Sequence, residues 1–218
     1  MGVIRINGKP LDGVQILEGV SLDPPEPVVS WAAIPGGLDV DTSTLLTAGV
    51  PRYGHRSVTL PCMVVGETLW AAQRRLGAQL SGKWVELGFE DRPGWHLSGR
   101  ANVSDWSWPG RHEAVLFTLG VDAEPYWWKD TATTVKVTGA ASPGAAFSLP
   151  PTGYPVMPRI TVTGSTVTIV KGSQKISLPV GVTSWVDGML LMPEAPAVAG
   201  RIVGTGTVEF FWQEGWPT

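Results

Sequence analysis

Glycine and proline interrupt this chain from end to end, and they restrict its fold more than any other feature of the sequence. There are 27 glycines and 19 prolines among 218 residues. Both residue types are unfavourable inside helices and mark turns. Long helices are therefore largely excluded, and the apolar residues, 43% of the chain, must be buried mainly by short strands. The sequence predicts a mainly β protein.

Alternating apolar residues predict an antiparallel sheet in the first half. Residues 56–66 alternate as a strand, although Pro61 favours an edge position or a bulge because it cannot donate a ladder hydrogen bond. Short strands in the first 22 residues predict an opening hairpin or edge strands, and residues 28–35 a further strand. The remaining segments with this pattern are residues 84–89, 95–106 and 112–122. We expect one face of this sheet to be buried.

Residues 67–82 predict the one convincing helix. Its apolar positions recur at helical spacing and form one stripe of Leu69, Ala72, Leu76 and Leu80. Glu67 lies at its start, where a negative charge interacts favourably with the helix dipole, and Gly82 lies at its end, where glycine commonly terminates a helix. The stripe should pack across the predicted sheet.

A change in strand length and residue composition near residue 130 predicts two domains. Residues 1–128 form an N-terminal β-barrel-like sheet domain with the helix, and residues 129–218 form a C-terminal β-sandwich of shorter strands separated by turns. Residues 139–158 are expected to be a linker within the second domain, and residues 184–193 one of its β segments. Residues 38–51 are too long for a tight hairpin and predict an extended arm or loop.

Several classes of site are disfavoured by residue type and spacing. The single cysteine, Cys62, falls on the apolar side of a predicted strand and should be a buried thiol. His55, His96 and His112 lack the spacing of a metal site, and we find no nucleophile motif and no phosphate-binding glycine loop. We therefore expect no metal and no cofactor.

Charge and hydropathy argue against nucleic acid and membranes as partners. The net charge is −3 and there is no basic run, so we expect no binding to nucleic acid. No apolar run is long enough to span a bilayer and no signal peptide precedes the first strand, so we expect no membrane insertion and folding in a cytoplasm.

Two carboxylates offer the one enzymatic hypothesis. Glu86 and Glu90 are four residues apart on a predicted strand, and a glycosidase needs a facing pair of carboxylates. The segment from Glu90 to Gly94, however, has the residue types of a tight turn in which acidic side chains cap backbone amides. We favour the turn and predict that the protein is not an enzyme.

Four segments in a fixed order carry a resemblance to a known family. They are Ile34–Asp39, Pro51–Leu60, Leu87–Trp95 and the pair Gly99-Arg100, with the predicted helix between the second and third. In this order they resemble the N-terminal region of distal tail proteins of siphovirus-type bacteriophages, which have long non-contractile tails. The resemblance covers about residues 1–128, and the chain departs from it at Gly37, where an arginine is common.

This resemblance implies a structural virion protein. It would form a hexameric ring at the phage tail tip, assembled in the bacterial cytoplasm, that joins the tail tube protein to the tail-tip or baseplate hub. The C-terminal sandwich would be galectin-like. The family-motif residues, which are candidates for the subunit interface, are Gly36, Asp39, Tyr53, Gly54, Arg56, Asp91, Pro93, Gly94, Trp95, Gly99 and Arg100.

An alternative function starts from the tryptophans of the C-terminal part. Trp185, Trp212 and Trp216 would stack on sugars if they share an exposed face, which would make the sandwich a carbohydrate-binding module for host-surface attachment. In the ring-forming hypothesis, the motif residues Tyr53, Arg56, Trp95 and Arg100 are candidate anchors, either between subunits or inside the N-terminal fold.

Overall fold

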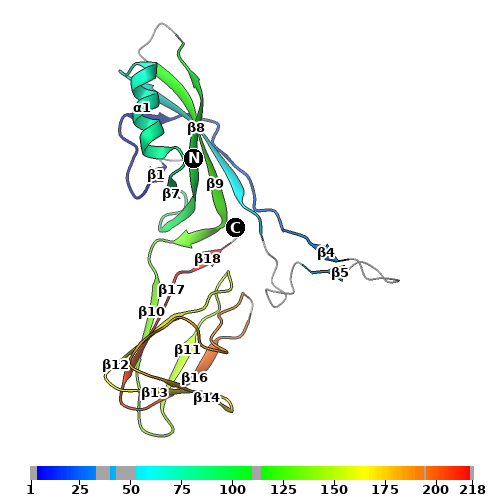
Figure 1. The fold of residues 1–218 in the computed structure, drawn as a ribbon, viewed down its shortest axis with the longest axis vertical. Coiled ribbons are helices and arrows are strands. Elements are labelled where there is room, and N and C mark those ends of the chain that lie inside the picture. Colours follow the sequence, from blue (N-terminus) through cyan, green and yellow to red (C-terminus); the bar gives the residue numbers. More distant parts are fainter. Residues whose placement is uncertain (1–3, 33–39, 43–52, 110–113, 194, 217–218) are drawn as a thin grey trace. The chain divides into compact units, whose positions relative to one another are not determined.

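The structure, a computed structural model, describes residues 4–32, 40–42, 53–109, 114–193 and 195–216. It is mainly β with one helix in the described residues, which confirms the predicted fold class (Figure 1). The elements fall into two compact units: unit 1 extends to Asp130, and unit 2 comprises Thr131–Trp216.

Unit 1 is built on a curled antiparallel sheet with the order β1-β7-β8-β9-β6-β2, and β3 also pairs with β6. A separate two-stranded ladder is formed by β4 and β5, which we call the extension. The strands are β1 (Arg5–Ile6), β2 (Val14–Ile16), β3 (Ser21–Leu22), β4 (Trp31–Ala32), β5 (Val40–Asp41), β6 (Arg56–Val65), β7 (Trp84–Gly88), β8 (Trp95–Ser107) and β9 (Ala114–Lys129).

The single helix, α1 (Leu69–Leu80), confirms the helix predicted for residues 67–82. Thr68 caps its start, since its hydroxyl oxygen accepts a hydrogen bond of 3.3 Å from the Ala71 amide. Its buried residues are Ala72, Leu76 and Leu80, three of the four in the predicted stripe. The helix therefore covers the sheet with the face that the apolar spacing indicates.

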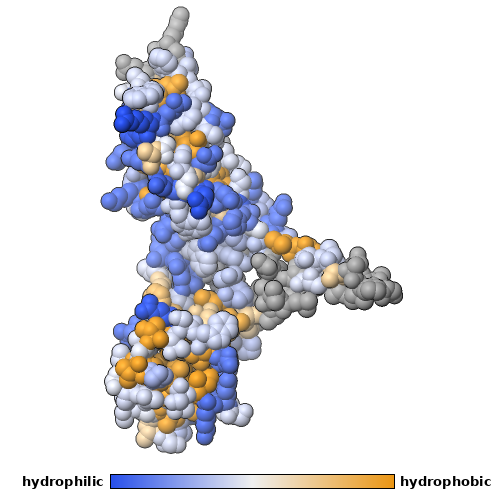
Figure 2. Space-filling view, in the orientation of Figure 1, coloured by the Kyte–Doolittle hydropathy of each residue, from blue (hydrophilic) through white to orange (hydrophobic). Residues whose placement is uncertain are grey.

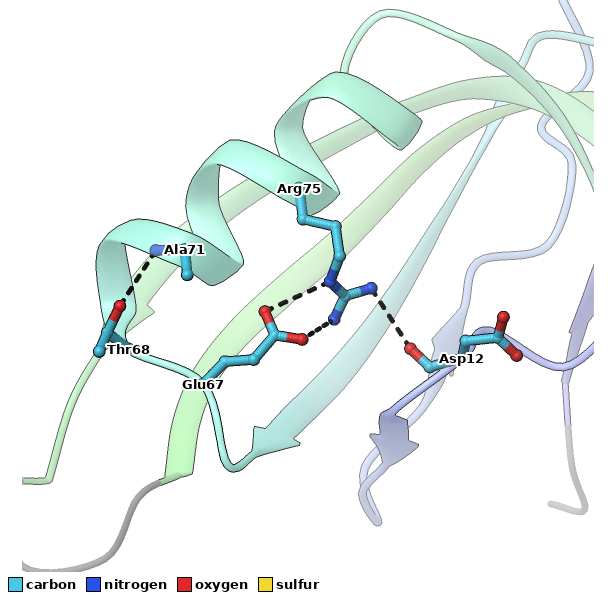
Figure 3. Close-up of polar contacts among 5 residues, drawn as sticks. All are labelled: Asp12, Glu67, Thr68, Ala71 and Arg75. Atoms are coloured by element: carbon cyan, nitrogen blue, oxygen red, sulfur yellow. Dashed lines mark hydrogen bonds and ion pairs between the residues drawn. The ribbon is translucent and has the colours of Figure 1, made fainter.

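An ion pair fixes α1 to the loop between β1 and β2. The Arg75 guanidinium lies 2.7 Å from the Glu67 carboxylate and also donates to the Asp12 carbonyl at 3.3 Å (Figure 3). One arginine thus links the residue just before the helix, the helix itself and a turn more than sixty positions earlier in the chain.

The core of unit 1 lies between α1 and the strands of the sheet. Its largest fully buried side chains are Ile4, Leu60, Leu76, Leu87, Leu97 and Leu119. Cys62 is buried among them, and this burial raises the pKa of its thiol to about 12. The prediction of a buried cysteine is confirmed.

Pro61 does not occupy the sheet edge that its residue type suggested. Strand β6 has β9 on one side and both β2 and β3 on the other. The Pro61 carbonyl accepts from the Leu17 amide at 2.8 Å, just after β2 ends and before β3 begins. Because the N–H and C=O of one residue point to the same side of an antiparallel strand, the missing N–H of Pro61 faces this interruption, where no ladder bond is required.

Unit 2 contains two four-stranded antiparallel sheets that share one core, so it is a β-sandwich. The sheet orders are β10-β17-β12-β15 and β11-β16-β13-β14. The strands are β10 (Thr133–Thr138), β11 (Ala145–Leu149), β12 (Arg159–Thr163), β13 (Val167–Lys171), β14 (Gln174–Leu178), β15 (Gly181–Thr183), β16 (Val198–Val203) and β17 (Thr207–Trp212), and β18 (Gly215–Trp216) follows.

Two expectations about unit 2 were wrong. Strand β11 lies within residues 139–158, which we expected to be a linker, because its few large apolar residues are surrounded by Pro, Ser and Gly. Residues 184–193 are apolar but form no strand. There the Met189 amide donates to the Val186 carbonyl at 3.2 Å and closes a turn at Asp187 and Gly188, whose residue types favour a turn over a strand.

Candidate functional site

The motif segment Pro51–Leu60 holds the base of the extension. The Tyr53 ring meets Tyr126 of β9 edge-on, with ring centroids 6.2 Å apart and an interplanar angle of 88°. The Gly54 amide donates to the Glu26 carbonyl at 2.8 Å, and Pro27 and Tyr53 form an isolated β-bridge. Tyr53 and Gly54 therefore attach the chain on both sides of the extension to the sheet.

Arg56 lies inside unit 1 and is only 4% exposed. Its guanidinium donates to the Pro125 carbonyl. Burial lowers the pKa of Arg56, and the nearby charge of Arg92 lowers it further. Since Arg92 in turn lies over the Trp127 ring, 4.6 Å from its centroid, both arginines are held by the fold. Arg56 is thus an internal anchor.

The motif segment Leu87–Trp95 contains a tight turn between β7 and β8. Amide donors at Arg92 and Trp95 reach the carbonyls of Phe89 and Arg92 at 3.2 and 3.3 Å. Gly94 has a φ of +83°, a left-handed conformation that glycine adopts without strain. The turn that we favoured over a carboxylate pair is thereby present, and its residues Asp91, Pro93 and Gly94 are exposed.

A cavity of about 290 Å³ adjoins this turn. Its lining includes charges of both signs, from Arg5, Glu90, Arg92 and Asp130, and the half-buried ring of Trp95. Glu86 is exposed on β7 and does not line this cavity. The cavity therefore does not bring together the two carboxylates of the enzymatic hypothesis.

Gly99 and Arg100 pack β8 against its neighbours in unit 1. A Cβ atom on Gly99 would lie 2.4 Å from the Asp122 carbonyl oxygen and 2.5 Å from the Ala123 Cα, so only glycine fits where β8 and β9 approach at a register shift. The Arg100 guanidinium donates to the Gly82 carbonyl at 3.0 Å, just after α1. Both residues therefore hold the fold together.

The extension and the segment that leads into it expose apolar side chains. Val28, Val29 and Trp31 are 44%, 53% and 64% exposed. Thr42 closes the ladder, donating from its amide and its hydroxyl to the Ser30 carbonyl at 2.7 and 3.0 Å. Apolar surface is visible at the base of the extension (Figure 2). Gly36, Asp39 and most of residues 38–51 lie outside the described residues.

The three tryptophans proposed to stack on sugars do not form one platform. Trp212 is 2% exposed and belongs to the core of the sandwich, which corrects its assignment to an exposed face. Trp216 is half-exposed, and its ring packs so closely on Gly153 that a Cβ there would lie 2.4 Å from it. Trp185 is 69% exposed.

Sequence reasoning missed two histidine–carboxylate contacts. The His96 Nδ1 lies 2.7 Å from the Asp130 carboxylate, and His55 lies 3.1 Å from Asp122. The partners are 34 and 67 positions apart, so no local motif joins them. Within the described part of the chain, no group of three or more His, Cys, Asp or Glu side chains is arranged to hold a metal, and the helix is too short to cross a membrane.

The fold is similar to that of a solved phage protein. No family model and no curated protein matches the sequence. The crystal structure of the SPP1 Dit protein (gp 19.1), described as a paradigm of the hub adsorption apparatus in phages that infect Gram-positive bacteria, matches with a TM-score of 0.55. The match covers 97% of this chain and 98% of that chain at 16% sequence identity. At this identity, the likeness concerns the fold.

Proposed function

We propose that this protein is a non-enzymatic structural component of a bacteriophage tail tip, a distal tail protein of a siphovirus-type phage. The single observation that carries the proposal is the fold likeness to SPP1 Dit over nearly the full length of both chains. The order of the motif segments in residues 34–100 supports it independently, because that resemblance was drawn from sequence alone.

In this proposal, unit 1 is the N-terminal domain that builds a homo-oligomeric ring, with six copies as in the resembled family. The ring joins the tail tube protein to the tail-tip hub within the virion. Unit 2 is the galectin-like C-terminal domain. The family-motif residues then act mainly within each subunit, because Arg56, Gly99 and Arg100 make their contacts inside unit 1.

The extension is the part of unit 1 best suited to contact a neighbouring subunit. An isolated two-stranded ladder is marginally stable in water, and β4-β5 pairs with no other described strand. Burial against a second copy would stabilise the exposed Trp31 of the extension, and Val28 and Val29 just before it, as it does for aromatic anchors in protein interfaces. Tyr53 and Gly54 hold the base of the extension in place for that contact.

The test is the solution mass of the chain by light scattering at micromolar concentration. The proposal predicts a discrete oligomer of the 23.2 kDa chain, and Trp31→Ser should shift it toward monomer. Trp108→Ser is the matched control, because Trp108 is similarly exposed at the end of β8, away from the extension. A wild-type chain that stays monomeric would contradict the ring, while an oligomer unaffected by Trp31→Ser would contradict the role of the extension alone.

A further inference from the structure

Trp185 is an exposed aromatic ring on a well-anchored turn. The residues on both sides of the turn, Val186 and Met189, are buried in the core of the sandwich. The amide of Met189 donates to the Val186 carbonyl at 3.2 Å and closes the turn. An exposed ring on a rigid support loses little conformational entropy when it binds a ligand.

The orientation of the indole is also held by a hydrogen bond. Its Nε1–H donates to the Asp187 carboxylate at 3.3 Å. Asp187 is exposed, and a carboxylate can accept about four hydrogen bonds, so the bond from Trp185 leaves acceptor capacity beside the ring.

A second turn brings further polar groups to the same place. The Lys171 ammonium, at the end of β13, donates to the Gly188 carbonyl. The Gln174 side-chain oxygen, at the start of β14, would lie 3.0 Å from a Cβ on Gly188, and the Lys171 nitrogen 3.5 Å from it. The β13-β14 hairpin therefore lies directly on the turn that carries Trp185.

We propose that Trp185, Asp187, Lys171 and Gln174 form a binding subsite for a neutral pyranose. The apolar C–H face of a pyranose stacks on an aromatic ring, and its hydroxyls need both donors and acceptors, which the ammonium, the carboxylate and the amide supply. The charges of Lys171 and Asp187 cancel, so the subsite should not favour a phosphate-bearing glycan. This inference goes beyond the proposed structural function and does not depend on it.

The surroundings of Trp185 favour a sugar over a protein partner. A protein hot spot lies near the centre of an interface, in a well-packed pocket whose surrounding contacts exclude water. The Trp185 ring is instead accompanied by an exposed carboxylate, and the turn that follows it contacts a hairpin that presents an ammonium and an amide. Such a mixture matches the amphipathic surface of a saccharide.

Saturation-transfer NMR on the full chain tests the proposal. The probes are methyl β-glucoside, methyl β-galactoside and N-acetylglucosamine, with glycerol phosphate as the anionic probe. We expect at least one neutral sugar to bind, Trp185→Ala to weaken it about tenfold or more, and Trp185→Phe to retain part of the affinity. Phe211→Ala is the matched control, because Phe211 is an exposed aromatic on β17 of the same unit.

Three results would overturn the subsite. They are the absence of saturation transfer to every neutral sugar, equal binding by wild type and Trp185→Ala, and preferential binding of glycerol phosphate. If no sugar binds and Trp185→Ala instead lowers the oligomeric mass, the ring of Trp185 belongs to a protein interface. If Trp185→Ala abolishes sugar binding and the oligomeric mass stays the same, the proposed structural function is unaffected.

Discussion

Replacing Gly99 with alanine should destabilise unit 1 strongly. The new methyl group would lie 2.4 Å from the Asp122 oxygen, 2.5 Å from the Ala123 Cα and 2.8 Å from a Val121 methyl. Overpacking of this kind costs about 1–3 kcal/mol. Because two of these atoms are backbone, relief requires β8 and β9 to separate, and each ladder hydrogen bond lost adds about 1 kcal/mol. We therefore expect a loss of about 2–4 kcal/mol.

Hydrogen exchange of the β8 and β9 peptides in the full chain, together with urea unfolding, measures this loss. Gly120→Ala is the matched control in the same strand pair, because a Cβ there meets only the Asn102 oxygen at 3.9 Å. It should leave stability within about 0.5 kcal/mol of wild type or raise it slightly. Equal stability of Gly99→Ala and Gly120→Ala would refute the reasoning that backbone approach requires glycine at position 99.

Three further predictions concern burial and charge. Trp212→Ala should cost unit 2 about 3–5 kcal/mol in urea unfolding, whereas Trp185→Ala should cost less than about 0.5 kcal/mol; similar losses would contradict the burial difference. Cys62 should react with thiol reagents only when the protein unfolds. Its contribution to the free energy of unfolding, measured relative to Cys62→Ala, should fall by about 1.4 kcal/mol per pH unit between pH 9.0 and about 12, because only the unfolded thiol loses its proton in that range. Glu67→Gln should cost at most about 1 kcal/mol, and this cost should shrink with added salt, since the pair with Arg75 is partly exposed; a salt-independent cost would argue against an ionic contribution.

Local patterns in the sequence predicted the fold class and the helix well. The stripe of Ala72, Leu76 and Leu80 is a short-range signal, and these side chains are buried as the spacing indicates. Alternation in residues 56–66 likewise predicted β6 and the burial of Cys62. Such patterns succeed because the position of a residue along a helix or strand decides whether its side chain lies on the buried or the exposed face of that element.

Features that depend on partners distant in the chain were harder to predict. Pro61 is tolerated because a break between β2 and β3 lies opposite its missing N–H, and no local pattern reveals that break. Strand β11 lacks an apolar run of its own and is defined by its pairing with β16. The expectation that Trp212 is exposed failed because it lies on the inward side of β17, next to the outward-facing Phe211.

The candidate site was predictable in its segments but not in the roles of its residues. The turn at residues 90–94 follows from its residue types, whereas the contact of Arg56 with Pro125 and the bond between His96 and Asp130 join strands that only the tertiary fold brings together. Gly99 could have been singled out as a close-approach glycine within a strand. Among the motif residues that the structure describes, Arg56, Gly99 and Arg100 make contacts within unit 1 with partners that no local pattern reveals.

Negative-stain imaging of the purified full chain at micromolar concentration tests the central claim most directly. The proposal predicts closed rings built from six copies of the 23.2 kDa chain. A field of isolated particles of single-chain size, unchanged as the protein is concentrated, would contradict it.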